Sequence, residues 1–183
     1  MAGLDGPSDD GESGRMRGAE TFAGGVHDHD RCMAEALDAA GRICARRGAR
    51  LTRLRREVLA ILWRDHAPRG AYAILEALRR EGRRAAPPTV YRALDFLLAH
   101  GLVHRIESRN AYVGCPDPRR PHDGQFLICT ECGNATELSD ARIRVAIREG
   151  ARALGFRVTG ETIEIAGLCP HCQEEDAAHE YAR

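Results

Sequence analysis

Hydrophobic positions recur at helical spacing through the first half of the chain. The pattern predicts four helices, over residues 32–48, 51–65, 70–82 and 86–102. Thr52 is the expected N-cap of the second helix, and Pro87 suits the first turn of the fourth. Three of these segments reach a glycine where the pattern stops, at Gly48, Gly82 and Gly101.

After the fourth helix the hydrophobic period changes from about 3.6 to 2. The segments LVHRIES (102–108) and AYVGC (111–115) flank the turn residues Ser108, Arg109 and Asn110. This pattern predicts a β-hairpin. Three or four short helices followed by a hairpin is the element order of a winged helix-turn-helix, which places its last helix in the DNA major groove.

The second half predicts a smaller α/β unit. Residues 125–138 and 156–169 have strand patterns. Residues 139–155 between them have a helical pattern, with Ser139 or Asp140 as the cap and Gly155 as the stop. A unit this small buries little apolar surface by itself, so we expect a metal ion or a partner chain to stabilise it.

The expected fold class is therefore α+β. We divide the chain into a disordered tail over 1–30, a winged-helix DNA-binding domain over 31–110, a small α/β domain over 111–175 and a second tail over 176–183. The first tail is rich in Gly, Asp, Glu and Ser and poor in large apolar residues.

Charge is distributed unevenly along a chain whose formal net charge is zero. Residues 1–30 carry −5 and residues 111–183 carry −4, whereas residues 31–110 carry seventeen arginines and eight acidic residues, which gives +9. A codon bias towards arginine would explain why the chain has no lysine, but not why the positive charge collects in one segment. The positive segment favours a nucleic-acid partner.

The sequence has neither a membrane-spanning pattern nor a secretory-signal pattern, which argues against a membrane or secreted protein. No apolar run approaches the ~20 residues of a membrane span. The N-terminal stretch MAGLDGPSDDGESG lacks a basic start followed by an apolar run, so it is not typical of a secretory signal. We therefore expect a cytoplasmic protein, in which cysteine pairs serve as metal ligands or redox thiols more often than as disulfides.

Four of the seven cysteines form two C-x-x-C pairs, Cys129 with Cys132 and Cys169 with Cys172. Each pair has the spacing that lets two thiolates converge on one tetrahedral zinc ion. Thirty-six residues separate the pairs. A strand–helix–strand segment of this length would bring the second pair next to the first. The alternative is a thiol-redox enzyme, which would need one such pair rather than two. Cys32 and Cys44 fit the apolar face of the first helix instead.

A second group of potential ligands lies near the expected domain boundary: His104, Cys115, His122 and Glu137. Taken singly, each is more often a structural or solvated residue. Together they offer two imidazoles, a thiolate and a carboxylate, which would suit a second tetrahedral metal site.

Several motifs make the chain resemble a known family: RLTRLRREVLAIL, AAPPTVYRALDFLLAHGLVHRIES, FLICTECG and GLCPHC. In this order, over roughly residues 36–172, they resemble the ferric uptake regulator family of metal-sensing repressors. The PPTVYRALDFLL stretch and Cys115 are most similar to its zinc uptake branch. Iron-type members usually carry an HHDH-like run where this chain has PHDGQF.

The resemblance implies a homodimeric, zinc-responsive transcriptional repressor rather than an enzyme. It places a structural zinc on Cys129, Cys132, Cys169 and Cys172. It places a regulatory zinc on His104, Cys115, His122 and Glu137, so about two zinc ions per chain are expected.

In the same way, the resemblance assigns operator DNA contacts to Tyr72, Thr89, Tyr91 and Arg92, and dimerisation to residues 111–175. Membrane and small-molecule partners are not expected. The remaining alternative within the family is an iron, manganese or peroxide sensor, but a thiolate ligand favours zinc.

Overall fold

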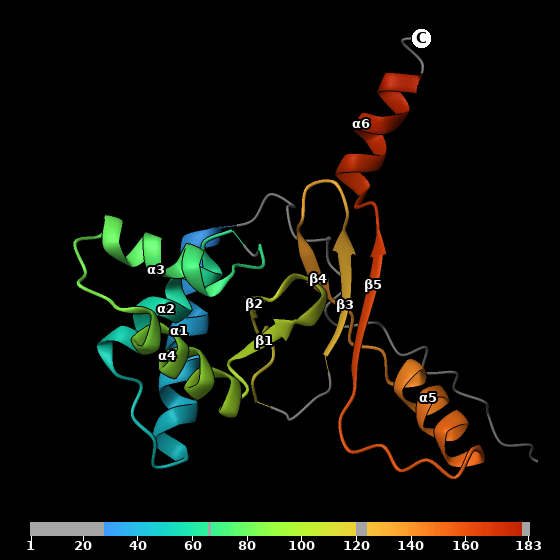
Figure 1. The fold of residues 1–183 in the computed structure, drawn as a ribbon, viewed down its shortest axis with the longest axis horizontal. Helices are drawn as coiled ribbons and strands as arrows, with labels where there is room; N and C mark the ends of the chain where they lie inside the picture. The colour runs from blue at the N-terminus through green and yellow to red at the C-terminus, as the bar shows by residue number, and fades with distance from the viewer. Residues whose placement is uncertain (1–27, 66, 120–123, 181–183) are drawn as a thin grey trace, which may run out of the picture.

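The computed structural model describes residues 28–65, 67–119 and 124–180, and it has the predicted α+β architecture. In Figure 1 a bundle of helices and a three-stranded sheet lie on either side of a β-hairpin. The bundle comprises α1 (His29–Arg46), α2 (Arg53–Trp63), α3 (Ala71–Arg80) and α4 (Pro87–Ala99). The later elements are β1 (Val103–Ile106), η1 (Glu107–Arg109), β2 (Ala111–Gly114), β3 (Gly124–Cys129), β4 (Ala135–Glu137), α5 (Ala141–Ala153), β5 (Thr162–Gly167) and α6 (Pro170–Glu180).

The four predicted helices of the bundle are present and begin and end close to the predicted signals. Thr52 is the N-cap of α2, although its side chain makes no capping hydrogen bond. Pro87 is the first residue of α4. Proline lacks a backbone N–H, but the N–H groups of the first turn have no acceptor within the helix, so no helical hydrogen bond is lost. Helix α1 begins at His29, two residues inside the segment that composition assigned to the tail, because Asp28 caps it by accepting a hydrogen bond from the Arg31 N–H.

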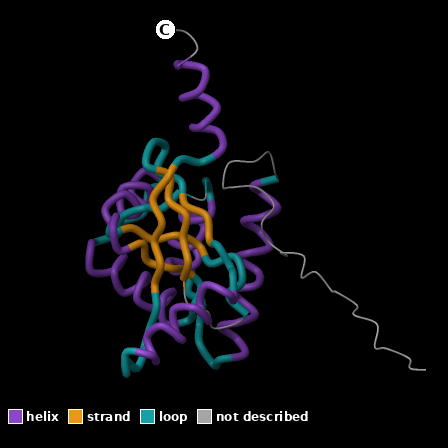
Figure 2. Tube along the Cα trace, turned by 90° about the vertical axis from the view of Figure 1, so that its right-hand side faces the viewer, coloured by secondary structure: helices purple, strands orange, loops and turns teal. Residues whose placement is uncertain are grey.

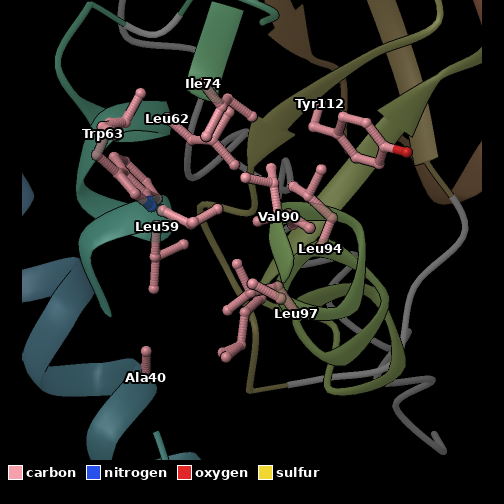
Figure 3. Packing of buried hydrophobic residues seen from close by; sticks show 14 of the residues in the cluster. Ala40, Leu59, Leu62, Trp63, Ile74, Val90, Leu94, Leu97 and Tyr112 are labelled. Atoms are coloured by element: carbon pink, nitrogen blue, oxygen red, sulfur yellow. The ribbon is translucent and has the colours of Figure 1, made fainter. Parts of the chain in front are cut away.

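The core of the bundle is built mainly from aliphatic side chains of all four helices, together with Trp63 and Tyr112 (Figure 3). Leu59 and Leu62 of α2, Ile74 of α3 and Leu94 of α4 are at most 1% exposed. Cys44 is buried in the same cluster and Cys32 packs at its edge, as their positions on the helix predicted. These apolar contacts hold α4 against α2 and α3.

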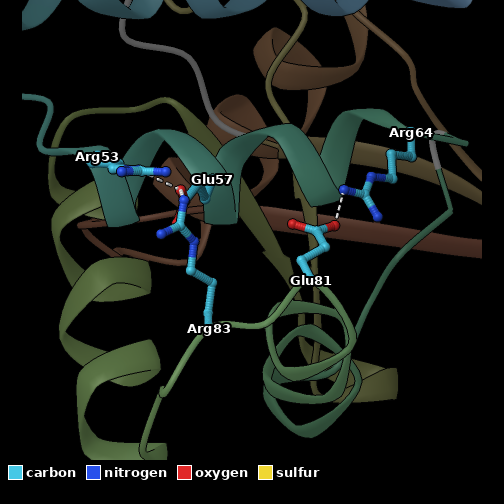
Figure 4. Close-up of polar contacts among 5 residues, drawn as sticks. All are labelled: Arg53, Glu57, Arg64, Glu81 and Arg83. Atoms are coloured by element: carbon cyan, nitrogen blue, oxygen red, sulfur yellow. Dashed lines mark hydrogen bonds and ion pairs between the residues drawn. The ribbon is translucent and has the colours of Figure 1, made fainter.

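Ion pairs also join α2 to the segment between α3 and α4 (Figure 4). Glu57 accepts a hydrogen bond from Arg53 at 3.0 Å on its own helix and pairs with Arg83 of the connecting segment. Arg64 pairs with Glu81 at the end of α3. These contacts are partly exposed, so we expect each to contribute little to stability and mainly to orient the connection into α4.

Strands β1 and β2 form the wing, the antiparallel hairpin of residues 103–114. His104 pairs with Val113, and Ile106 pairs with Ala111. The turn is a 3₁₀ segment that ends at Asn110 in the left-handed conformation, with a φ of 47°. The predicted division at 110/111 falls within this hairpin, since β2 pairs with β1; the domain limits stay a prediction.

The second sheet has the strand order β4–β3–β5, with β4 antiparallel and β5 parallel to β3. Helix α5 lies in the long connection between β4 and β5. Helix α6, which follows β5, projects from the end of the sheet in both views of the molecule (Figures 1 and 2). The sequence pattern predicted neither this helix nor its extent to Glu180, in a segment assigned to a tail. Among the described residues, the structure contains no helix with the length and apolar character of a membrane span.

Candidate metal sites and DNA-facing helix

The two C-x-x-C pairs converge at one end of the three-stranded sheet. Because β3 and β5 are parallel, their carboxyl ends meet, and Cys129 pairs in register with Gly167. Cys129 ends β3, and Cys169 and Cys172 lie at the start of α6. The four Sγ atoms of Cys129, Cys132, Cys169 and Cys172 all lie within 4.8 Å of one another.

A backbone hydrogen bond favours the thiolate form of Cys129, whereas burial raises the pKa of Cys132, and the neighbouring thiols and burial raise the pKa of Cys172. The Cys169 N–H donates to Cys129 Sγ at 3.4 Å, and this contact is the largest cause that lowers the pKa of Cys129, to about 6. The Thr130 N–H donates to the Gly167 carbonyl at 2.8 Å, which ties the turn after β3 to the end of β5. All seven cysteines lie in the described part of the chain, and none forms a disulfide. Four converging thiols are the donor set of a structural zinc site.

A second cluster lies where the wing meets the sheet. His104 comes from β1, Cys115 follows β2 and Glu137 ends β4, and one ligand atom from each lies within 4.8 Å of the other two. The Nε2 atom of His104 is 3.5 Å from Oε2 of Glu137. The fourth residue of the predicted set, His122, lies outside the described residues.

The environment of Cys115 suits a thiol that is protonated until a cation replaces the proton. Its side chain is 1% exposed, and burial, assisted by the charge of Glu137, raises the pKa of Cys115 to about 12. Nitrogen, sulfur and carboxylate donors at this spacing fit a zinc ion, and the thiolate disfavours Fe(II) and Mn(II). Since His104 and Glu137 belong to different sheets, a cation held by both would join the wing to the second sheet.

A third group of potential ligands, His171, Cys172 and Glu175, lies on α6. The sequence pattern did not single it out, although residues three and four positions apart on a helix share a face. His171 and Glu175 are exposed and Cys172 already belongs to the four-cysteine cluster, so this group does not form a separate site.

The residues predicted to contact DNA lie mainly on the outer side of α4. Val90 and Leu94 are buried in the bundle, whereas Tyr91 is 40% exposed and Arg92 is exposed. Thr89 is partly buried, and Tyr72 near the start of α3 is 69% exposed. The hydrophobic face of α4 therefore points inward, and the polar and aromatic side chains of the prediction are accessible.

A helical bundle with a β-hairpin wing, joined to a small sheet that carries a thiol cluster, defines a winged-helix protein with metal-binding residues in its second unit. The comparisons agree with this class. The profile of the ferric uptake regulator family matches residues 46–166, and the chain belongs to that family.

The most informative relatives are zinc regulators. The zinc uptake regulation protein of Escherichia coli (strain K12) is 41% identical over 144 residues, which cover 78% of this chain and 84% of the relative. A solved zinc uptake regulator in complex with zinc and DNA has a TM-score of 0.75 and 40% identity, over 79% of this chain and 97% of the other. The crystal structure of holo XcZur has a TM-score of 0.71 and 42% identity, over 76% and 98% of the two chains.

Proposed function

We propose that this protein is a zinc-responsive transcriptional repressor that acts in the cytoplasm and binds operator DNA as a homodimer. The observation that carries the proposal is the cluster of His104, Cys115 and Glu137, in which the wing and the second sheet each supply ligand atoms within 4.8 Å of one another. The names of the relatives, and the complex of one of them with zinc and DNA, support zinc and DNA as the ligands of this chain.

The two clusters have different roles in this proposal. A structural zinc is bound by Cys129, Cys132, Cys169 and Cys172, and it connects the ends of β3 and β5 to the start of α6. His104, Cys115, Glu137 and His122 form the regulatory site, which gives about two zinc ions per chain. A zinc ion at the regulatory site supplies positive charge and tetrahedral coordination, with no redox chemistry of its own.

The regulatory residues act on the orientation of the wing. His104 is tied to the helical bundle, because β1 follows α4 directly and packs against it. Glu137 is fixed to β3 through the register of Phe126 with Glu137. Ligation of both residues limits the angle between the helical bundle and the sheet, and a dimer with a fixed angle can place its two α4 helices in DNA half-sites at lower conformational cost.

Exposed apolar side chains on α5 and β5 support the homodimer. Val145 and Ile147 of α5, Phe156 after it, and Ile165 and Leu168 at β5 are between 36% and 67% exposed. Helix α5 has no buried residue, and β5 is an edge strand with β3 as its neighbour in the described sheet. Exposed large apolar side chains are typical of protein–protein contacts, and a second copy of this chain would cover them.

Two measurements on the full-length protein test the proposal. Metal analysis after purification without added metal should give at least one tightly bound zinc per chain and up to about two. The second measurement uses genomic DNA fragments that the zinc-loaded protein selects. In gel shifts at buffered free zinc, binding to these fragments should increase with the zinc concentration and should be lost when a chelator is added. DNA binding that does not depend on zinc, or that depends on Fe(II) or Mn(II) instead, would overturn the proposed function.

A further inference from the structure

The turn of the wing makes polar contacts with the second sheet that the metal clusters do not explain. Glu164 lies in the middle of β5 and is paired in register with Phe126. Its Oε1 accepts a hydrogen bond from the Glu107 N–H at 2.6 Å, and its Oε2 accepts one from the Ser108 N–H at 3.1 Å. One carboxylate from β5 therefore binds two successive backbone N–H groups of the turn, 56 and 57 residues away in sequence.

A second contact joins the same turn to the first cysteine pair. The Arg109 guanidinium donates to the Cys129 carbonyl at 3.0 Å. Gly133, the residue after Cys132, leaves room for this side chain, because a Cβ at Gly133 would lie 2.9 Å from Arg109 Nη1. Gly133 also has a φ of +78°, so its position suits glycine for backbone reasons as well.

Apolar packing connects these polar contacts to the regulatory cluster. Ile106 and Val113 of the wing form one buried cluster with Phe126, Ile128 and Ala135 of the second sheet. The His104 ring also packs edge-on against Phe126, with 5.3 Å between ring centroids. The wing therefore meets the sheet along its length, with metal ligands towards one end, apolar side chains next to them, and Glu164 and Arg109 at the turn.

We propose that Glu164 and Arg109 are positioning residues that hold the wing turn on the second sheet, and so set the free zinc concentration at which the protein binds DNA. This inference rests on the proposed zinc-dependent function. The pair of contacts is called the wing–sheet contact below: Glu164 with Glu107 and Ser108, and Arg109 with Cys129.

The physical basis is a conformational equilibrium shared by two sets of contacts. In this proposal the wing exchanges between the observed arrangement against the sheet and one away from it, and both zinc ligation and the wing–sheet contact favour the first arrangement. A ligand that binds one arrangement has an apparent dissociation constant that rises as the population of that arrangement falls. Loss of the wing–sheet contact should therefore raise the zinc requirement without removing any zinc ligand.

The charge of Glu164 strengthens this effect, because hydrogen bonds to a carboxylate are stronger than those to a neutral group. Burial raises the pKa of Glu164, but the hydrogen bonds from Ser108 and Glu107 outweigh burial and hold the pKa below its ordinary value. The carboxylate is thus ionised at neutral pH.

The test uses the full-length dimer with its structural zinc retained, as wild type and as Glu164→Ala. Hydrogen–deuterium exchange of the peptide that covers residues 103–114 is measured first, with and without added zinc. We expect the amides of Glu107 and Ser108 to exchange faster in Glu164→Ala, most clearly without added zinc, because both have lost their acceptor. This readout does not depend on DNA binding.

The second measurement is operator binding as a function of buffered free zinc. Half-maximal binding in Glu164→Ala should need roughly fivefold more zinc, the effect of one or two hydrogen bonds on the equilibrium. At saturating zinc the variant should approach the operator affinity of the wild type, whereas a merely destabilised protein would bind more weakly at every zinc concentration. The matched control is Glu107→Gln, which removes a charge from the same turn but from a side chain that pairs with Arg105 inside the wing.

Exchange rates and zinc curves of Glu164→Ala that superimpose on those of the wild type would overturn the inference. A wild type with no zinc response would instead refute the proposed function, and the exchange experiment would still report on the contact. If Glu164→Ala does not form a folded dimer, Arg109→Ala takes its place. Its control is Arg105→Ala, since Arg105 donates to Asn110 at 3.0 Å within the wing and not to the sheet.

Discussion

Cys115 lies at the end of the wing with a side chain that is 1% exposed, a position that suits either an apolar filler or a metal ligand. Its neighbours favour the second interpretation. Potential ligand atoms of His104 and Glu137 lie within 4.8 Å of its Sγ. A cysteine that only fills apolar space would have apolar neighbours at that distance rather than an imidazole and a carboxylate. The burial of a carboxylate such as that of Glu137 is also costly, and a cation at this site would offset that cost.

The first prediction concerns this thiol. Cys115→Ser should give a folded dimer that keeps about one zinc per chain in place of about two and needs more free zinc to bind operator, because a serine hydroxyl is a poor zinc ligand. Since the pKa of Cys115 is raised to about 12, the thiol of the metal-free protein is protonated at neutral pH and must release a proton when zinc binds. Zinc affinity should therefore fall as the pH is lowered.

Calorimetry in buffers of different ionisation enthalpy measures this proton release. The variant should release about one proton fewer per regulatory zinc than the wild type. Equal proton release and superimposable zinc curves for the two proteins would contradict the assignment of Cys115 to the site.

The neighbouring glycine gives the second prediction. A Cβ on Gly114 would lie 2.5 Å from the ring of Trp63, the one tryptophan in the sequence, which is itself buried. Gly114→Ala should destabilise the protein by about 1–3 kcal/mol through overpacking and should displace Cys115 next to it. Chemical unfolding followed by Trp63 fluorescence measures the loss. Gly160→Ala is the control, since nothing lies within 4 Å of a Cβ there and the residue lies outside the helices and strands.

At the scale of elements, the parallel pairing of β3 with β5 is what brings the two cysteine pairs together. The pairs are separated by a helix and a long connection, and the strand register places Cys129 opposite Gly167, two residues before Cys169. Backbone pairing thus places the thiols next to one another, and a bound zinc would in turn hold the strand ends and α6.

The third prediction follows from this arrangement. Cys129→Ser should remove one ligand of the structural zinc and destabilise the second unit severely, since a structural zinc contributes on the order of 10 kcal/mol to the folding of small domains. Thermal unfolding and sedimentation should show a lower melting temperature and loss of the dimer. Cys32→Ser, at the edge of the helical core, should leave both unchanged. A Cys129→Ser dimer with a wild-type melting temperature would rule out the structural role.

Helix α4 gives the fourth prediction. Arg92 lies on its exposed side, while Val90 and Leu94 fix the opposite side in the core. Arg92→Ala should weaken operator binding by ~1–3 kcal/mol if the side chain reads a base edge, with zinc content and dimerisation unchanged. Gel shifts with operator and scrambled DNA distinguish the possibilities. Equal losses on both would indicate a phosphate contact, and no loss on either would remove Arg92 from the interface.

At the scale of the whole molecule, the second unit exposes large apolar side chains on α5 and β5. Its sheet has an edge at β5, and its helix α5 has no fully buried residue in the described structure. The arrangement in Figure 1, with α5 set apart from the sheet, is the one expected of a subunit that buries this surface against a second copy.

The fifth prediction tests this surface. Ile165 is 44% exposed on β5, and Ile165→Asp should shift the protein from dimer to monomer, because a carboxylate is costly to bury in an apolar contact. Sedimentation at several protein concentrations measures the shift. Thr162→Asp places the same charge on the opposite face of the same strand and should leave the dimer intact. Equal behaviour of the two variants would exclude the Ile165 face from the interface.

The sequence by itself determined the local elements of this protein, because local signals control them. Hydrophobic period, prolines and glycines predicted the four helices of the bundle and the hairpin, whereas the DNA contacts of Tyr91 and Arg92 were implied by the resemblance to the family. The C-x-x-C spacing indicated a zinc cluster for the same reason, since the geometry of two ligands three residues apart is local. Helix α6 could not be predicted in this way, because its apolar residues form no clear stripe along the helix.

Only the tertiary structure decided which distant residues meet. The approach of His104 to Glu137 depends on how the wing packs on the second sheet, and no spacing within either segment fixes that distance. Glu164 had no sequence signal, because its partners are backbone N–H groups that every non-proline residue carries. Contacts between segments more than fifty residues apart are set by packing, strand order and register, which is why the ligands could be proposed from the sequence but the wing–sheet contact could not.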